Sequence, residues 1–126
     1  EFDYVVIDGE AGIEQVNRRV MEKVSHMLLV SDPSKKGTTV IKTIKKVADE
    51  LVMYEKIGVI INRLGEESQK QYIDTGDLPI LAYIPEDKAL QMADIMGESV
   101  LNLPDDSHLV SGVQRALEQI GILRKL

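Results

Sequence analysis

Four short apolar runs alternate with longer amphipathic segments along the chain. Polar side chains hardly interrupt these runs, which cover residues 4–7, 27–30, 57–61 and 80–84. Continuous apolar runs, in contrast to strict alternation, are typical of strands covered on both faces, as in parallel sheets. The pattern therefore predicts four buried strands.

The segments between these runs have helical periodicity. Apolar residues recur every three or four positions around 13–24, 40–51, 86–96 and 107–123, whereas the segment 66–75 is polar and its helical signal is weaker. Asp106 or Ser107 is the expected N-cap of the last helix. The order β-α-β-α-β-α-β-α with a final helix predicts an α/β fold, a three-layer α/β/α domain with a mainly parallel sheet and helices on both faces.

Length and composition restrict the function. The 126 residues are one domain's worth, so residues 1–126 are expected to form a single domain. The chain contains no cysteine, which excludes a disulfide, a thiolate metal site and a cysteine nucleophile within it. A net charge of −6 and the absence of tryptophan argue against a nucleic-acid partner. No apolar run reaches the ~18 residues of a membrane span, so we expect no span and a cytoplasmic location.

Polar residues follow each predicted strand, at the edge where open parallel sheets bind ligands. The four strand ends are Asp8, Ser31-Asp32-Pro33, Asn62-Arg63 and Pro85-Glu86-Asp87. Because unpaired buried charges are costly, an edge with this many carboxylates is expected to be wet or occupied by a ligand or metal.

Asp8 stands directly after an apolar strand, as a Walker-B acid does when it holds Mg²⁺ through water beside nucleotide phosphates. It suits a cap of the following turn equally well. Gly12 would let a backbone N–H approach a phosphate closely, or would serve ordinary turn geometry. Asn62 carries an amide that can read a purine edge, or is a turn residue.

The segment 34–39 does not satisfy the spacing of a phosphate-binding loop. With Gly37 as the second glycine of that motif, Asp32 takes the place of the first glycine and Thr38 that of the lysine. The segment is therefore interpreted as the basic first turn of a solvated helix. His26 and His108 are far apart in the sequence and indicate no metal site.

Together the strand ends resemble those of MinD/ParA-type P-loop ATPases. The segment 3–14 resembles their Walker-B and switch II region, 58–63 their adenine-recognition strand, and 84–87 the loop that closes over the base. Within that group, residues 10–18 and the following Asp32-Pro33-Ser34 look most like the CooC-type ATPase. That family serves nickel insertion into carbon monoxide dehydrogenase and related acetyl-CoA synthase enzymes.

The resemblance implies a P-loop NTPase-like fold, ATP and Mg²⁺ as ligands, and ATP hydrolysis by the parent protein. Asp8 would hold Mg²⁺ through water and Gly12 would act as the switch at the γ-phosphate, which makes them the expected catalytic residues. The residues expected around the adenine are Asn62, Arg63, Pro85, Glu86 and Asp87. A homodimer that closes on ATP binding and a client metalloenzyme of the carbon monoxide dehydrogenase type are also implied.

The chain departs from this family in two respects. The family's phosphate loop lies N-terminal to the Walker-B strand, as does the Cys-x-Cys pair of CooC-type ATPases, and this sequence contains neither. The chain begins Glu1-Phe2-Asp3, so we expect it to be the C-terminal half of the ATPase domain, with nickel or zinc bound only through the missing half. Alone, it is expected to hydrolyse no ATP, and run 4–7 is expected to expose an apolar strand edge through which the chain self-associates.

Two other functions stay open at this stage. MinD/ParA-type ATPases also position division machinery or partition plasmids. A non-catalytic flavodoxin-like or receiver-like binding domain would likewise place Asp8 and Asp32 at strand ends. A receiver, however, needs a lysine after its last strand, where this chain has Pro85-Glu86.

Overall fold

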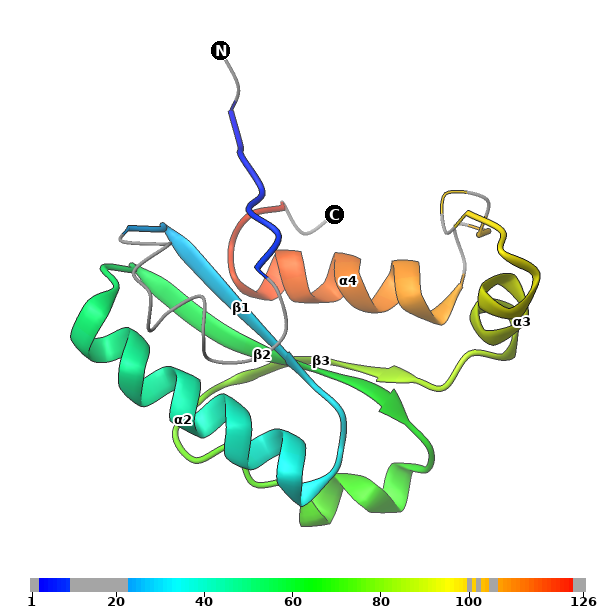
Figure 1. The fold of residues 1–126 in the computed structure, drawn as a ribbon, viewed down its shortest axis with the longest axis horizontal. Coiled ribbons are helices and arrows are strands. Elements are labelled where there is room, and N and C mark those ends of the chain that lie inside the picture. Colours follow the sequence, from blue (N-terminus) through cyan, green and yellow to red (C-terminus); the bar gives the residue numbers. More distant parts are fainter. Residues whose placement is uncertain (1–2, 10–22, 100, 102, 105–106, 124–126) are drawn as a thin grey trace.

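The computed structural model describes residues 3–9, 23–99, 101, 103–104 and 107–123. Within them, three parallel strands form one sheet in the order β1-β2-β3, with β2 at the centre (Figure 1). The strands are β1 (His26–Ser31), β2 (Lys56–Leu64) and β3 (Ile80–Pro85). The helices are α2 (Lys35–Leu51), η1 (Glu67–Tyr72), α3 (Lys88–Met96) and α4 (His108–Gln119), of which η1 is a 3₁₀ helix.

Two helices cover opposite faces of the sheet, which confirms the three-layer prediction (Figure 1). The apolar stripe of α2 packs on one face in a cluster made by Met27, Leu29, Ile41, Ile44, Ala48, Val52, Val59, Ile61 and Leu78. A smaller cluster joins α4 to the other face through Ile60, Ala82, Ile84 and Ala116. Neighbouring residues of β2 point to opposite faces, so this central strand is buried by both helices.

The predicted strands 27–30, 57–61 and 80–84 fall inside β1, β2 and β3, and the helical segments 40–51, 86–96 and 107–123 correspond to α2, α3 and α4. Details differ at their ends. The polar segment 66–75 forms only the short 3₁₀ helix η1, and none of the side chains of Glu67–Tyr72 is buried to support a longer helix. The last helix begins after its N-cap Ser107, whose hydroxyl oxygen accepts from the N–H of Val110, and ends at Gln119.

The prediction of a strand at 4–7 is wrong for this structure. Residues 3–9 form no strand, and their apolar side chains are exposed, Val5 by 77% and Val6 by 92%. The Tyr4 hydroxyl donates to the Ile122 carbonyl at 3.3 Å. A strand needs a neighbour for its backbone hydrogen bonds, and among the described residues this segment has none. The apolar run at 4–7 thus predicted a buried strand, but the run alone does not identify the element that would cover it.

Most of the predicted helix 13–24 lies outside the described residues. Its last two positions are extended and not helical, because Lys23 forms an isolated parallel bridge with Met53 and the N–H of Val24 donates to the Met53 carbonyl. Across the described parts of the chain, no helix is long and apolar enough to cross a membrane.

Candidate functional site at the carboxyl edge of the sheet

The turns that follow β1, β2 and β3 meet at the carboxyl edge of the sheet, on the right in Figure 1. A cavity of about 450 Å³ lies there, which we call the carboxyl-edge cavity. Its lining residues are Asp32, Pro33 and Ser34 after β1, Arg63 and Gly65 at the end of β2, Gln69 and Tyr72 on η1, and Glu86 after β3. Residues that follow each of the three strands therefore lie around one cavity at this edge.

The turn after β1 is held by a relay of hydrogen bonds that begins at a carboxylate. Asp32 Oδ1 accepts from the backbone N–H of Ser34 at 3.0 Å and from the Ser34 hydroxyl at 2.5 Å. The Ser34 oxygen in turn accepts from the N–H of Gly37 at 2.9 Å, which caps α2. The turn and the first turn of the helix are therefore one rigid unit.

Gly37 is required by this packing and not by a phosphate loop. A Cβ at this position would lie 2.5 Å from Asp32 Oδ1 and 2.6 Å from the hydroxyl oxygen of Ser31. Only a residue without a side chain lets the helix begin so close to the turn. The rejection of a phosphate-binding loop at 34–39 agrees with this geometry, because α2 has already begun at Lys35.

The Asp32 carboxylate is strongly favoured in its charged form. Hydrogen bonds from the Ser34 hydroxyl and then from the Ser34 N–H hold the pKa of Asp32 below its ordinary value, and the positive charge of Arg63 adds a smaller effect. Asp32 therefore carries its negative charge at neutral pH, where Arg63 interacts with it favourably.

Arg63, which lines the cavity, has an unusual backbone conformation. Its φ of +59° lies in the left-handed region, and it is the one non-glycine residue with positive φ in the described chain. The pairing of β2 with β3 is irregular between Ile61 and Leu64, which turns the strand at this point. The side-chain oxygen of Asn62 accepts from the N–H of Arg63 at 3.0 Å and supports the turn.

The turn after β3 is tied to the end of β2. The N–H of Glu86 donates to the Leu64 carbonyl at 2.9 Å, which brings Glu86 beside the turn that carries Arg63. The next residue, Asp87, is the N-cap of α3: its Oδ1 accepts from the N–H groups of Ala89 at 2.9 Å and Leu90 at 3.4 Å.

The structure brings together some of the predicted site residues and separates others. Arg63 and Glu86 line the carboxyl-edge cavity. Asn62 is half-buried beside it, with its oxygen engaged by the backbone. Pro85 lines a different cleft, along β3, and Asp87 acts as a helix cap.

Only one of the two expected catalytic residues lies within the described part of the chain. Asp8 is exposed in the segment 3–9 and is not among the cavity's lining residues. Gly12 lies outside the described residues. Among the residues that the structure describes, no group of three or more His, Asp or Glu side chains could hold a metal ion.

Three lining residues, Gly65, Gln69 and Tyr72, were not predicted as site residues. They belong to the polar segment after β2, where no motif distinguished them. Gln69 Oε1 accepts from the N–H of Gly65 at 2.9 Å, which folds η1 back over the end of the strand. The sequence of this segment indicated only a weak helix and did not mark these three residues as lining a cavity.

Comparisons with known proteins agree on the fold. No protein-family model matches the chain. It is 32% identical over 124 residues to an uncharacterized ATP-binding protein of Methanocaldococcus jannaschii, covering 95% of this chain and 49% of that protein. A second ATP-binding protein of the same organism, also uncharacterized, is 30% identical over 102 residues, with 78% and 39% covered. The chain thus spans at most about half the length of these curated relatives.

Two solved structures share the architecture. One is the septum site-determining protein MinD of Pyrococcus horikoshii, complexed with Mg-ADP, with a TM-score of 0.57, 22% identity, and 77% of this chain and 41% of that chain covered. The other is the cell division ATPase MinD of Pyrococcus furiosus, with a TM-score of 0.54, 22% identity, and 76% and 42% covered. The chain therefore has a parallel α/β fold that matches part of the P-loop NTPase fold of MinD.

Proposed function

We propose that the chain is part of a MinD/ParA-type P-loop ATPase and supplies the nucleoside side of its ATP site. The observation that carries this proposal is the shared cavity of Arg63 and Glu86, two residues expected near the base from separate strand ends. The cavity's volume lies within the range of small-molecule sites. The ATP-binding relatives and the MinD-like fold support the same class of ligand.

The lining side chains fit a nucleoside. Tyr72 presents a largely exposed aromatic ring on which a base can stack. Gln69 uses its oxygen on Gly65, which leaves its NH₂ group to donate to a base. The carboxylates of Asp32 and Glu86 are acceptors of the kind that bind ribose hydroxyls in nucleotide-binding folds.

The same side chains do not fit a triphosphate. Asp32 is held in its charged form, and Glu86 adds a second carboxylate, whereas Arg63 is the one cation among the lining residues. Phosphates placed beside two carboxylates would be repelled. We therefore assign the phosphates and Mg²⁺ to residues other than these. The coordination of Mg²⁺ by Asp8, and the role of Gly12 at the γ-phosphate, remain part of this proposal.

Binding of adenosine and of ATP to the 126-residue chain tests the proposal by isothermal titration calorimetry. In the absence of Mg²⁺ both ligands should bind weakly, with a Kd of about 1 mM, which corresponds to about −4 kcal/mol. Their affinities should be similar, because Gly12 alone forms no phosphate cradle. Arg63→Asn removes the guanidinium while keeping a residue that tolerates left-handed backbone, and should weaken both. Lys46→Gln, on the exposed side of α2, is the matched control.

Two results would contradict this assignment. One is a much higher affinity for ATP than for adenosine in the absence of Mg²⁺, which would place a phosphate cradle within this chain. The other is equal binding of adenosine by the Arg63→Asn variant and the parent chain. Turnover is a separate test: the isolated chain should release no phosphate from ATP, and Mg²⁺-dependent hydrolysis by it would refute the division of the site.

The narrower proposal is a role in nickel insertion, with a homodimer that closes on ATP binding and a carbon monoxide dehydrogenase-type client. It rests on the CooC-like residues 10–18 and Asp32-Pro33-Ser34. Positioning or partitioning, as in the MinD proteins, is the competing role. The coding sequence directly upstream discriminates them: a Gly-x-x-x-x-Gly-Lys-Thr-type loop supports the ATPase, and a Cys-x-Cys pair supports the metal role.

A further inference from the structure

A second cleft runs along the outer edge of β3 and begins beside the carboxyl-edge cavity. It encloses about 400 Å³, and we call it the β3 cleft. Its floor consists of four consecutive residues of β3, 80–83, together with Leu64 and Pro85. Its walls are Glu67 and Lys70 of η1 on one side and His108 and Arg115 of α4 on the other.

β3 is an outer strand of the sheet. Within the described residues, β2 pairs with one side of it and no strand pairs with the other. An unpaired edge presents backbone N–H and C=O groups that can receive another extended chain. The walls of η1 and α4 leave this edge accessible as a groove.

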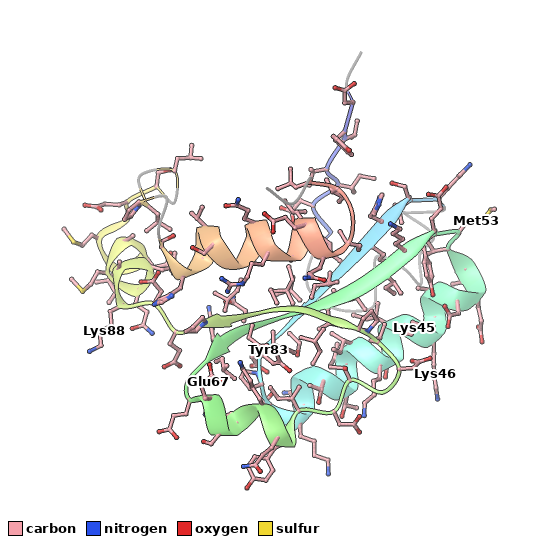
Figure 2. All side chains as sticks on the ribbon, turned by 180° about the vertical axis from the view of Figure 1, so that it is seen from behind. Lys45, Lys46, Met53, Glu67, Tyr83 and Lys88 are labelled. Atoms are coloured by element: carbon pink, nitrogen blue, oxygen red, sulfur yellow. The ribbon has the colours of Figure 1, made fainter. Side chains whose placement is uncertain are left out.

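Two cations from different elements converge on one residue of this edge. The ammonium of Lys70 lies 4.5 Å from the centre of the Tyr83 ring, and the guanidinium of Arg115 donates to the Tyr83 carbonyl at 3.4 Å. The side chain of Tyr83 extends from β3 toward η1 (Figure 2). Lys70 is also held by Glu67 at 2.7 Å, so its position is fixed before any partner arrives.

The local charge differs in sign from that of the whole chain. The chain carries a net charge of −6, yet Lys70 and Arg115 in the β3 cleft face the single carboxylate of Glu67. Charge complementarity therefore favours an acidic occupant. A nucleobase is disfavoured as the occupant, because Lys70 already covers one face of the Tyr83 ring.

We propose that the β3 cleft binds an extended acidic peptide segment of a partner protein, which adds to the sheet as a further strand beside β3. The edge groups of β3 supply backbone hydrogen bonds, and Lys70 and Arg115 select carboxylates. β3 spans six residues and ends at Pro85, so the segment it can pair with is about 20 Å long at ~3.3 Å per residue. This proposal does not depend on the nucleotide site.

The test is a titration of the ¹⁵N-labelled chain with a synthetic peptide of alternating glutamate and valine, followed by backbone amide chemical shifts. The shifts should concentrate on residues 80–85. A peptide with lysine in place of glutamate should not bind. An acidic peptide with two consecutive prolines at its centre should bind much less, because one of the two always faces β3 and lacks the N–H donor. Strong binding of the proline peptide, or shifts on β1 instead of β3, would overturn the proposal.

Charge-reversal variants provide the matched comparison. Arg115→Glu should weaken binding of the glutamate–valine peptide about tenfold, since attraction becomes repulsion of similar size. Lys46→Glu changes the net charge equally on α2, well away from Tyr83 (Figure 2), and should leave binding unchanged. Lys70→Gln is the second variant if Arg115→Glu proves unstable. Equal losses in the Lys46 and Arg115 variants, or inorganic pyrophosphate displacing the peptide from the parent chain, would refute a strand-specific site.

Discussion

Gly112 marks the closest approach of α4 to the sheet, and enlarging it tests how the second core cluster is packed. A Cβ at Gly112 would lie 2.4 Å from Cγ1 and 2.9 Å from Cδ1 of Ile84. Ile84 is 3% exposed and belongs to the cluster that joins α4 to β3. The contact is with the stem of a buried side chain, which has little room to move.

The expected effect of Gly112→Ala is a difference between two opposing terms. Alanine should stabilise the helix by about 1 kcal/mol relative to glycine. Forcing a methyl group into a packed core should destabilise by about 1–3 kcal/mol. We expect the steric term to exceed the helix term, giving a net loss of about 1 kcal/mol in the free energy of unfolding, taken from the middle of both ranges.

A double-mutant cycle with Ile84 isolates the contact. Ile84→Ala alone should cost about 2–5 kcal/mol, as buried isoleucine truncations do. In the Gly112→Ala background the new methyl group fills part of that void, so the cost of Ile84→Ala should fall by about 1 kcal/mol or more. Urea unfolding followed by far-UV circular dichroism measures all four proteins, with constant m-values as the check on two-state behaviour. Additive effects would show that α4 does not press on Ile84, and would refute the packing argument.

Three further predictions concern caps and carboxylates. Ser34→Ala should lower stability by about 1 kcal/mol through loss of the α2 cap, as measured by urea unfolding; no change would mean that the Gly37 N–H finds another acceptor. Asp87→Ala should lower the free energy of unfolding by a similar amount, whereas Asp87→Asn should keep it, because asparagine also caps helices. Adenosine affinity should be unchanged in both variants. Loss of affinity in the asparagine variant would mean that Asp87 contacts the nucleoside. Hydrogen bonds from Lys45 and then Tyr54 lower the pKa of Asp49 in the folded state. The contribution of Asp49 to the free energy of unfolding is therefore fully present above the ordinary aspartate pKa of about 3.9. It is lost as the pH falls through the lower folded-state pKa. Unfolding free energies across that acid range should fall less steeply in Asp49→Asn, and identical slopes would contradict the hydrogen bonds.

The elements that the sequence pattern predicted correctly are those whose apolar residues pack against other described elements. The stripe at Ile41, Ile44 and Ala48 faces the sheet as its spacing requires. The run 57–61 is buried on both faces as β2, with Val59 and Ile61 fully buried. In these cases the apolar residues and their partners both lie within the described chain, so periodicity was sufficient evidence.

The site was predicted less completely because it depends on how turns are held together. Arg63 and Glu86 were predicted at strand ends from the sequence. Their proximity, however, depends on the hydrogen bond from the Glu86 N–H to the Leu64 carbonyl, which a pattern of apolar and polar residues does not predict. Asp87 was assigned to the base by its position in a motif, whereas its carboxylate is used by the first turn of α3. Tyr72 was missed because a polar segment carries no periodic signal that would place its side chain.

Net charge was the weakest of the sequence arguments, since it sums over surfaces that act separately. A value of −6 correctly describes the whole chain, but screening limits exposed charges to a range of about 8 Å at physiological ionic strength. A partner therefore encounters a surface of that size and not the total. At the carboxyl edge it meets Asp32 and Glu86 around Arg63, and in the β3 cleft it meets Lys70 and Arg115 around Tyr83. Pro85 and Glu86 are adjacent in sequence but line different cavities, so the end of β3 separates the cavity proposed for a nucleoside from the cleft proposed for an acidic peptide.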